Sequence, residues 1–153
     1  PKRLFSFLDS NSGNNYQSEK ASEAISNGGF FGKGIGEGTL NSRIPEAHTD
    51  YIISVISEEF GILIIILIML IFLILSYQIL RKINLESDNK AKLILVGSIT
   101  IILLQAFIHI GVNIRFLPTT GMTLPFLSYG GSSIISTAIL SGVILNLTKR
   151  KLT

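Results

Sequence analysis

The feature that most constrains this chain is an uncharged apolar run from Phe60 to Leu80. The run is about 21 residues long, so as an α-helix it would measure roughly 31 Å, which matches the hydrocarbon core of a bilayer. A second uncharged run, from Leu93 to Ile114, has about 22 residues and is also long enough to span. No charge occurs from Phe116 to Thr148, but prolines and glycines interrupt the first half of this stretch. The sequence therefore predicts an all-α membrane helical bundle, with transmembrane segments at 51–80, 93–114 and 132–147.

The composition agrees with a membrane protein and excludes several other classes. Apolar residues make up 47% of the chain, charged residues make up 15%, and the mean hydropathy is +0.52. The chain has 0 Cys and 2 His, which excludes a disulfide framework, a thiolate nucleophile and a cysteine-ligated metal. The net charge of +3 does not indicate nucleic-acid binding, because the basic residues stand in small groups beside apolar segments.

The distribution of basic residues predicts which segments face the cytoplasm. Lys and Arg cluster in 81–92 and in the C-terminal tail, whereas 115–131 contains only Arg115. By the positive-inside rule, the first two segments are cytoplasmic and the remaining connections lie on the other side. The predicted order is an extracytoplasmic loop at 1–50, a cytoplasmic loop at 81–92, an extracytoplasmic or re-entrant loop at 115–131, and a cytoplasmic tail at 148–153.

The first 50 residues are richer in turn formers than the rest of the chain. We expect a loop at the membrane surface that contains one amphipathic helix around 16–25. The string GGFFGKGIGEG at 28–38 is similar in composition to phosphate-binding loops, but no apolar strand precedes it and no helix-forming run follows it. Its glycines instead predict tight turns and close approach of the backbone to a neighbouring segment or ligand.

Acidic residues stand at the outer end of the first span, where a lipid-facing helix has no reason to carry them. If Thr49 caps this helix, the polar residues that follow form one stripe that faces other helices or a watery cavity. The stripe consists of Asp50, Ser54, Ser57, Glu58 and Gly61. An equally weighted alternative is that Asp50 is a helix N-terminal carboxylate that only complements the helix dipole.

Glu46, His48 and Asp50 are crowded together where the loop meets the membrane. A partly buried carboxylate at this position can act as a general base for a hydroxyl group, and Glu46 or His48 could orient it. The simpler interpretation of His48 is a solvated loop histidine. Lys33 and Arg43 lie in the same loop, where cations could hold a diphosphate leaving group, although plain solvated charge is the interpretation favoured for both.

Polar residues also recur in the last two spans. Gln105, His109 and Asn113 share one helical face, and hydrogen bonds between helices explain them without catalysis. The uncharged segment 117–133 is rich in hydroxyls, and irregular backbone at membrane depth must be buried in protein or line a wet cavity. Small residues at a spacing of four predict a close helix contact below it, and these are Ser133, Thr137 and Ser141.

Several motifs follow one another over nearly the whole chain: RLFSFLD near the start, Tyr16 with Gln17, GGFFGKGIG from Gly28, PEAHTDYI from Pro45, SEEFG from Ser57 and LPTTGMTLPFLSYGGSS from Leu117. Their order and spacing resemble the SEDS family (shape, elongation, division and sporulation). The PEAHTD motif is closer to division-type members than to elongation-type members, whose motif usually has Arg where Ala47 stands.

The resemblance implies a polytopic bacterial inner-membrane protein with about ten spanning helices, of which this chain would supply the last three and the large loop before them. It also implies a peptidoglycan glycosyltransferase that polymerises lipid II together with a class B penicillin-binding protein transpeptidase and other divisome proteins. The family's essential acid falls on Asp50, which would act as the base. The other matched positions would shape the cavity, and they are Glu46, His48, Thr49, Glu58, Glu59, Ser128, Gly130, Gly131 and Ser132.

A diphosphate leaving group requires positive charge, which Lys33, Arg43 or a divalent cation such as Mg²⁺ would supply. Thr120 stands where some members have Lys, so another cation would have to replace that side chain here. Membrane lipid is an expected partner, and nucleic acid is not.

Two alternative functions remain open at this point. Polar stripes and a broken membrane segment are also typical of transporters, so the protein could move lipid II across the membrane. A divisome scaffold that only docks partner proteins is the other alternative.

Overall fold

The structure is a computed structural model that describes residues 16–39 and 47–149. Within these ranges the chain forms helices and no strands, which confirms the predicted all-α class. The helices are α2 (Tyr16–Gly28), α4 (Ile52–Phe60), α5 (Ile62–Leu85), α6 (Asn89–Asn113) and α7 (Gly131–Thr148).

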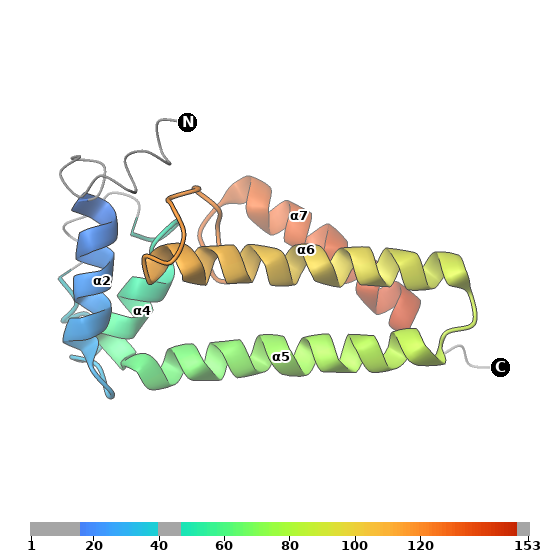
Figure 1. Ribbon diagram of the computed structural model, residues 1–153, viewed down its shortest axis with the longest axis horizontal. Helices are drawn as coiled ribbons and strands as arrows, with labels where there is room; N and C mark the ends of the chain where they lie inside the picture. Colours follow the sequence, from blue (N-terminus) through green and yellow to red (C-terminus); the bar gives the residue numbers. More distant parts are fainter. Residues whose placement is uncertain (1–15, 40–46, 150–153) are drawn as a thin grey trace.

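The three C-terminal helices form the membrane part of the described chain. Each of α5, α6 and α7 is long and apolar enough to cross a membrane. Figure 1 shows α5 and α6 side by side, joined by a short connection, with α7 crossing α6. The most apolar windows of α5 and α7 are each only 11% buried, whereas that of α6 is 33% buried. Helix α6 therefore lies at the centre of the bundle, and α5 presents most of its side chains outward.

The first predicted span differs from the structure, because 51–80 is not one helix. Helix α4 ends at Phe60 and α5 begins at Ile62, with Gly61 between them at φ 82°. Only glycine adopts this left-handed backbone conformation at little cost, so Gly61 interrupts the helix although the apolar run continues through it. The predicted cap at Thr49 is also wrong, because α4 starts after Tyr51 and no side chain caps it.

The predicted polar stripe changes as a consequence. Asp50 precedes α4 and Gly61 follows it, so neither residue belongs to the helix. The middle members Ser54, Ser57 and Glu58 lie on α4 and are buried.

The end of α5 and the start of α6 extend beyond the predicted spans. Helix α5 continues to Leu85 through Arg81 and Lys82, because long basic side chains are good helix formers and reach the bilayer surface from a helix end. Helix α6 starts at Asn89, where the carboxylate of Asp88 accepts a hydrogen bond from the backbone N–H of Lys90 at 3.0 Å. Charge therefore marked the edges of the apolar spans and not the ends of the helices.

Helix α2 confirms the helix predicted around 16–25 and packs on α4 at one end of the bundle (Figure 1). Ala21 and Ala24 of α2 are buried against Tyr51 and Val55, and Val112 near the end of α6 belongs to the same cluster. Because alanine side chains are small, α2 can approach α4 closely. This packing holds the segment that contains Asp50 against the end of α6.

The loop after α2 forms backbone hydrogen bonds to both helices at the α4–α5 junction. Its amides at Lys33 and Gly34 donate to the carbonyls of Glu58 and Glu59 at 2.9 and 3.0 Å, which satisfies acceptors at the end of α4. The N–H of Ile62 donates to the carbonyl of Gly29 at 3.0 Å, which satisfies a donor at the start of α5.

The glycines at this junction have the role expected of them, which is close backbone approach. A β-carbon added at Gly28 would lie 2.0 Å from the carbonyl oxygen of Ser57, and one added at Gly32 would lie 2.1 Å from that of Glu59. A larger residue at either position would therefore push the loop away from α4.

Candidate active site

The backbone of the segment that contains Asp50 is held by residues from the end of α6 and the connection to α7. The carbonyl of His48 accepts a hydrogen bond from the N–H of Tyr129 at 3.1 Å. The carbonyl of Thr49 accepts one from the hydroxyl of Ser128 at 2.8 Å. The carbonyl of Asp50 accepts one from the amide nitrogen of Asn113 at 3.0 Å. Three successive carbonyls are thus fixed by donors that lie far along the chain.

Asn113 is fully buried and connects three parts of the fold. Its amide nitrogen donates to the carbonyls of Asp50 and His109, and its amide oxygen accepts from the hydroxyl of Ser54 at 2.7 Å. The predicted hydrogen bonding between helices is therefore confirmed for this residue, since Ser54 lies on α4. The sequence reasoning missed that the partner of Asn113 is Asp50, although both residues stand at the outer ends of their predicted spans.

His109 lies one turn before Asn113 on α6 and is also buried. Its Nδ1 lies 2.8 Å from the carbonyl oxygen of Met122, so Nδ1 is the protonated nitrogen of this contact. The histidine therefore ties the irregular segment 114–130 to α6.

The hydroxyl of Ser128 stabilises the same irregular segment from the other side. Besides donating to Thr49, it accepts from the N–H of Leu124 at 2.8 Å. The backbone here includes residues with positive φ, 60° at Arg115 and 68° at Phe126. For residues with side chains this conformation is costly, so the surrounding contacts must hold it in place.

A polar pocket of about 320 Å³ lies between α6, this irregular segment and the start of α7. The hydroxyl of Thr123 donates to that of Ser133 across it at 2.6 Å. Helix α7 begins beside this pocket, and no side chain caps its first backbone amides. The lining residues are Gln105, Gly121, Met122, Thr123, Gly130, Ser132, Ser133 and Ser136.

Asp50 lies next to this pocket. A β-carbon built on Gly121 would stand 3.6 Å from the Oδ2 atom of Asp50, and Gly121 lines the pocket. Asp50 and Thr49 are half-buried, and His48 is exposed. Gly130 and Ser132 line the same pocket as Gly121, and the hydroxyl of Ser128 contacts the backbone of Thr49, next to Asp50. Gly121 is a neighbour of Asp50 that sequence reasoning missed, since glycine carries no chemical signal of its own.

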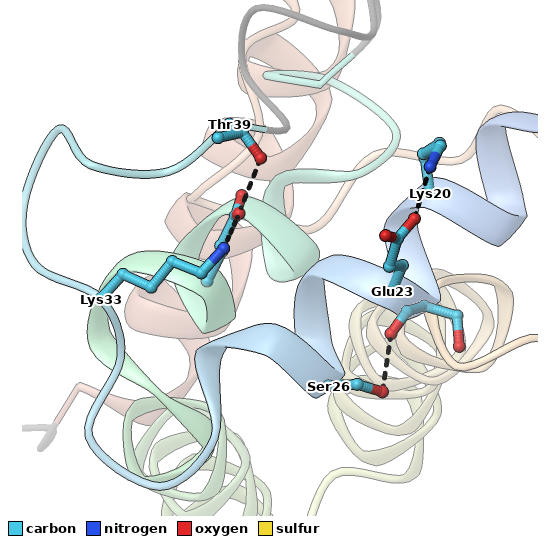
Figure 2. A network of polar contacts seen from close by, with 7 residues as sticks. Lys20, Glu23, Ser26, Lys33 and Thr39 are labelled. Atoms are coloured by element: carbon cyan, nitrogen blue, oxygen red, sulfur yellow. Dashed lines mark hydrogen bonds and ion pairs between the residues drawn. The ribbon is translucent and has the colours of Figure 1, made fainter.

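The remaining described candidates lie at the other end of α4, roughly 13 Å away along a nine-residue helix. The Glu58 side chain is only 1% exposed, and its Oε1 atom accepts from Lys33 Nζ at 2.9 Å and from the Thr39 hydroxyl at 3.1 Å. Figure 2 shows Lys33 and Thr39 pointing toward each other around this carboxylate. Glu59 is half-buried beside it.

The predicted site is therefore divided into two groups. Lys33 and Glu58 neutralise each other at the loop after α2, whereas Asp50 lies at the polar pocket. Arg43 and Glu46, the other predicted members, lie outside the described residues. Within the described ranges, no group of three or more His, Cys, Asp or Glu side chains is placed to hold one metal ion.

Comparison with other proteins identifies relatives along the whole chain. The model of a family of cell cycle proteins, named for FtsW, RodA and SpoVE, matches residues 1–152. A protein of Geobacter metallireducens named probable peptidoglycan glycosyltransferase FtsW is 42% identical over 128 residues, which is 83% of this chain and 34% of that protein. Proteins with the same name from Enterococcus hirae and Borreliella burgdorferi are 40% and 41% identical, and the matches cover 95% and 96% of this chain.

A solved structure has the same fold. It comes from work on the structural coordination of polymerization and crosslinking by a peptidoglycan synthase complex, and it superposes with a TM-score of 0.77 at 26% identity. That match covers 99% of this chain and 42% of the other. The chain spans 34% of the Geobacter relative, 36% of the Enterococcus relative and 42% of the Borreliella relative. On the evidence of the family model and these identities, the chain belongs to the FtsW/RodA/SpoVE family of cell cycle proteins, the SEDS family.

Proposed function

We propose that the full-length protein is a peptidoglycan glycosyltransferase that polymerises lipid II into glycan strands during cell division, with Asp50 as the general base. The names of the relatives support the reaction class, and the described fold supports a site at the membrane surface. Because this chain spans well under half of each relative, the activity belongs to the longer protein.

The reaction requires a base at the acceptor sugar. The 4-hydroxyl oxygen of an acceptor N-acetylglucosamine attacks the anomeric carbon of N-acetylmuramic acid on the donor, and the bond from that carbon to the diphosphate oxygen breaks. The hydroxyl proton passes to the Asp50 carboxylate, and undecaprenyl diphosphate leaves with its charge. Hydroxyl and backbone N–H donors around the pocket would hold sugar or phosphate oxygens during this step.

The observation that carries the proposal is the position of the Asp50 carboxylate beside Gly121, a residue that lines a pocket containing several hydroxyls. A base must lie within reach of the proton that it removes, in an orientation that does not change between turnovers. The hydrogen bonds to the carbonyls of His48, Thr49 and Asp50 give the backbone such a fixed orientation.

We assign Lys33 a different role from the one that its charge suggested. Its ammonium group contacts the buried Glu58 carboxylate, so in this arrangement it holds the loop after α2 and does not bind the leaving group. Arg43 remains a candidate for the diphosphate.

We further propose that the end of the bundle with Asp50 faces the extracytoplasmic side of the bacterial inner membrane. Figure 1 places α2, α4 and the segment 114–130 at one end and the connection between α5 and α6 at the other. The basic residues of that connection favour the cytoplasm for its end. A class B penicillin-binding protein transpeptidase and other divisome proteins would be partners at the extracytoplasmic end.

The test is glycan synthesis from purified lipid II by the full-length protein, alone and with its transpeptidase partner. We expect Asp50→Asn to lower the rate at least about 100-fold while lipid II binding is retained, because the amide cannot accept the proton. The matched control is Asp88→Asn, at the exposed start of α6 at the far end of the bundle, which should keep the wild-type rate. Polymerisation by Asp50→Asn at the control rate would contradict the assignment of Asp50 as the base.

A further inference from the structure

We propose that the tip of the loop after α2 inserts into the lipid leaflet beside the N-terminal end of α5. The tip consists of Phe30, Phe31 and Ile35, which are 72%, 84% and 80% exposed. Among the described residues, Phe31 and Ile35 are the two most exposed large apolar side chains. They lie on a loop and not on a membrane-spanning helix, so their exposure is not explained by the bundle itself.

The depth of this tip is determined by backbone hydrogen bonds to the first span. Ile62 is the first residue of α5, and its N–H donates to the carbonyl of Gly29, next to Phe30. A β-carbon added at Gly61 would lie 2.2 Å from the carbonyl oxygen of Phe30, so the two backbones touch. The tip therefore lies level with the start of an apolar span, at the height where the bilayer interface must be.

The tip also continues an apolar surface that already faces outward. Ile62, Leu63 and Ile66 in the first turns of α5 are all exposed, and Figure 1 shows α2 ending beside this part of α5. Large apolar side chains such as Phe can enter the boundary between headgroups and acyl chains at this level.

Charges in the loop are arranged in a way that permits shallow insertion. Lys33 stands between Phe31 and Ile35 in the sequence, but its ammonium group is turned back onto the Glu58 carboxylate at 2.9 Å (Figure 2). An unpaired ammonium group in lipid would be costly, and this pairing lowers that cost. Glu37 is exposed just beyond the tip, and an exposed carboxylate restricts insertion to the interface.

A lipid surface fits this tip better than a protein partner does. A stable protein interface buries about 800 Å² on each side, which is far more than three side chains supply. Insertion into lipid requires no complementary shape, and each buried apolar side chain contributes to it independently. Lipid contact at this loop would hold the α4–α5 junction at a constant height in the membrane. This inference does not depend on the reaction proposed above.

The test uses spin labels on the full-length protein in liposomes of phosphatidylethanolamine and phosphatidylglycerol. Each variant has one cysteine, in place of Phe31 or Ile35, in a full-length protein that carries no other cysteine. A nitroxide spin label is attached to this cysteine, and its collisions with oxygen and with a water-soluble nickel chelate are measured. Oxygen concentrates in lipid and the chelate in water, so their ratio reports depth. Leu70→Cys, on the exposed face of α5, is the lipid reference, and Asp88→Cys is the aqueous reference.

We expect labels at 31 and 35 both to show an oxygen-to-nickel ratio clearly above that at Asp88 and below that at Leu70, because Leu70 lies about 12 Å further along α5 from its start. A label at Glu37→Cys should give the aqueous value, because insertion ends before that residue. Aqueous values at 31 or 35 would overturn the proposal. Protection from both reagents at either position would also overturn it, because that pattern indicates a covering protein surface. Substitution at such exposed positions leaves the fold intact, so every outcome is interpretable.

Discussion

The amide nitrogen of Asn113, the last residue of α6, donates a hydrogen bond to the backbone carbonyl of Asp50 at 3.0 Å. Through this bond the central membrane helix determines where the acidic segment before α4 lies. The same amide group also binds Ser54 on α4 and the carbonyl of His109 on α6, so one buried side chain aligns two helices with the proposed base.

Asn113→Asp is expected to lower the turnover number of glycan synthesis at least about tenfold with little change in KM for lipid II, because a misplaced base weakens the reaction step more than binding. The new carboxylate oxygen would face the Asp50 carbonyl as a second acceptor. Steady-state kinetics on the full-length protein measure the effect. Asn89→Asp, the same chemical change at the exposed start of α6, should leave both constants unchanged. Equal kinetics for the two variants would contradict a positioning role.

Ser128→Ala removes a hydroxyl that both donates to the Thr49 carbonyl and accepts from the Leu124 N–H. Leu124 is fully buried, so its N–H would lose its partner, and we expect a destabilisation of about 1–3 kcal/mol. Thermal unfolding of the full-length protein in detergent measures the change. Ser76→Ala is the control. The Ser76 hydroxyl donates to the carbonyl of Leu73 in its own helix, so its loss should hardly change the stability. The idea fails if both alanine variants unfold at the same temperature.

The Lys33–Glu58 pair should show a clear coupling free energy in a double-mutant cycle. Because Glu58 is only 1% exposed, Lys33→Met removes an ammonium group from contact with a buried carboxylate, and this single variant should lose more stability than the double variant with Glu58→Gln. We expect a coupling above about 1 kcal/mol. The exposed pair Lys20–Glu23 on α2, also drawn in Figure 2, provides the control and should give at most about 0.5 kcal/mol. Equal coupling in the two pairs would refute a structural role for Lys33.

Gly61→Ala should be strongly destabilising, since the new methyl group would meet the carbonyl of Phe30 and the backbone would be held at φ 82°. Gly29→Ala is the control for a positive-φ glycine without a close neighbour, because Gly29 has φ 57° and nothing within 4 Å of its added β-carbon. The control should lose only about 1–2 kcal/mol from backbone strain, and Gly61→Ala clearly more. Chemical unfolding in detergent compares the two, and equal losses would mean that the loop does not need this close contact.

Local sequence predicts many residues of the candidate site, but it does not predict which of them lie close together. The acidic cluster before the first span and the hydroxyl-rich segment 117–133 were both recognised as candidates, since polar groups at membrane depth are unusual. The resemblance implies Glu58 and Lys33 at the cavity of Asp50, although the residues alone favour plain solvated charge for Lys33, and in the structure the two side chains pair with each other. The sequence offers no signal for such a pairing, because both side chains are equally compatible with solvent.

The sequence by itself determined the all-helical class and the three apolar spans. These are local properties, because a segment in lipid must satisfy its own backbone hydrogen bonds, and only a sufficiently long apolar helix can do so. Only the tertiary structure decided that Gly61 divides the first span and that Asn113 holds Asp50. The first depends on a loop that packs against the junction, and the second joins residues separated by 63 positions in the chain. Contacts between distant segments arise from packing, and no local pattern encodes them.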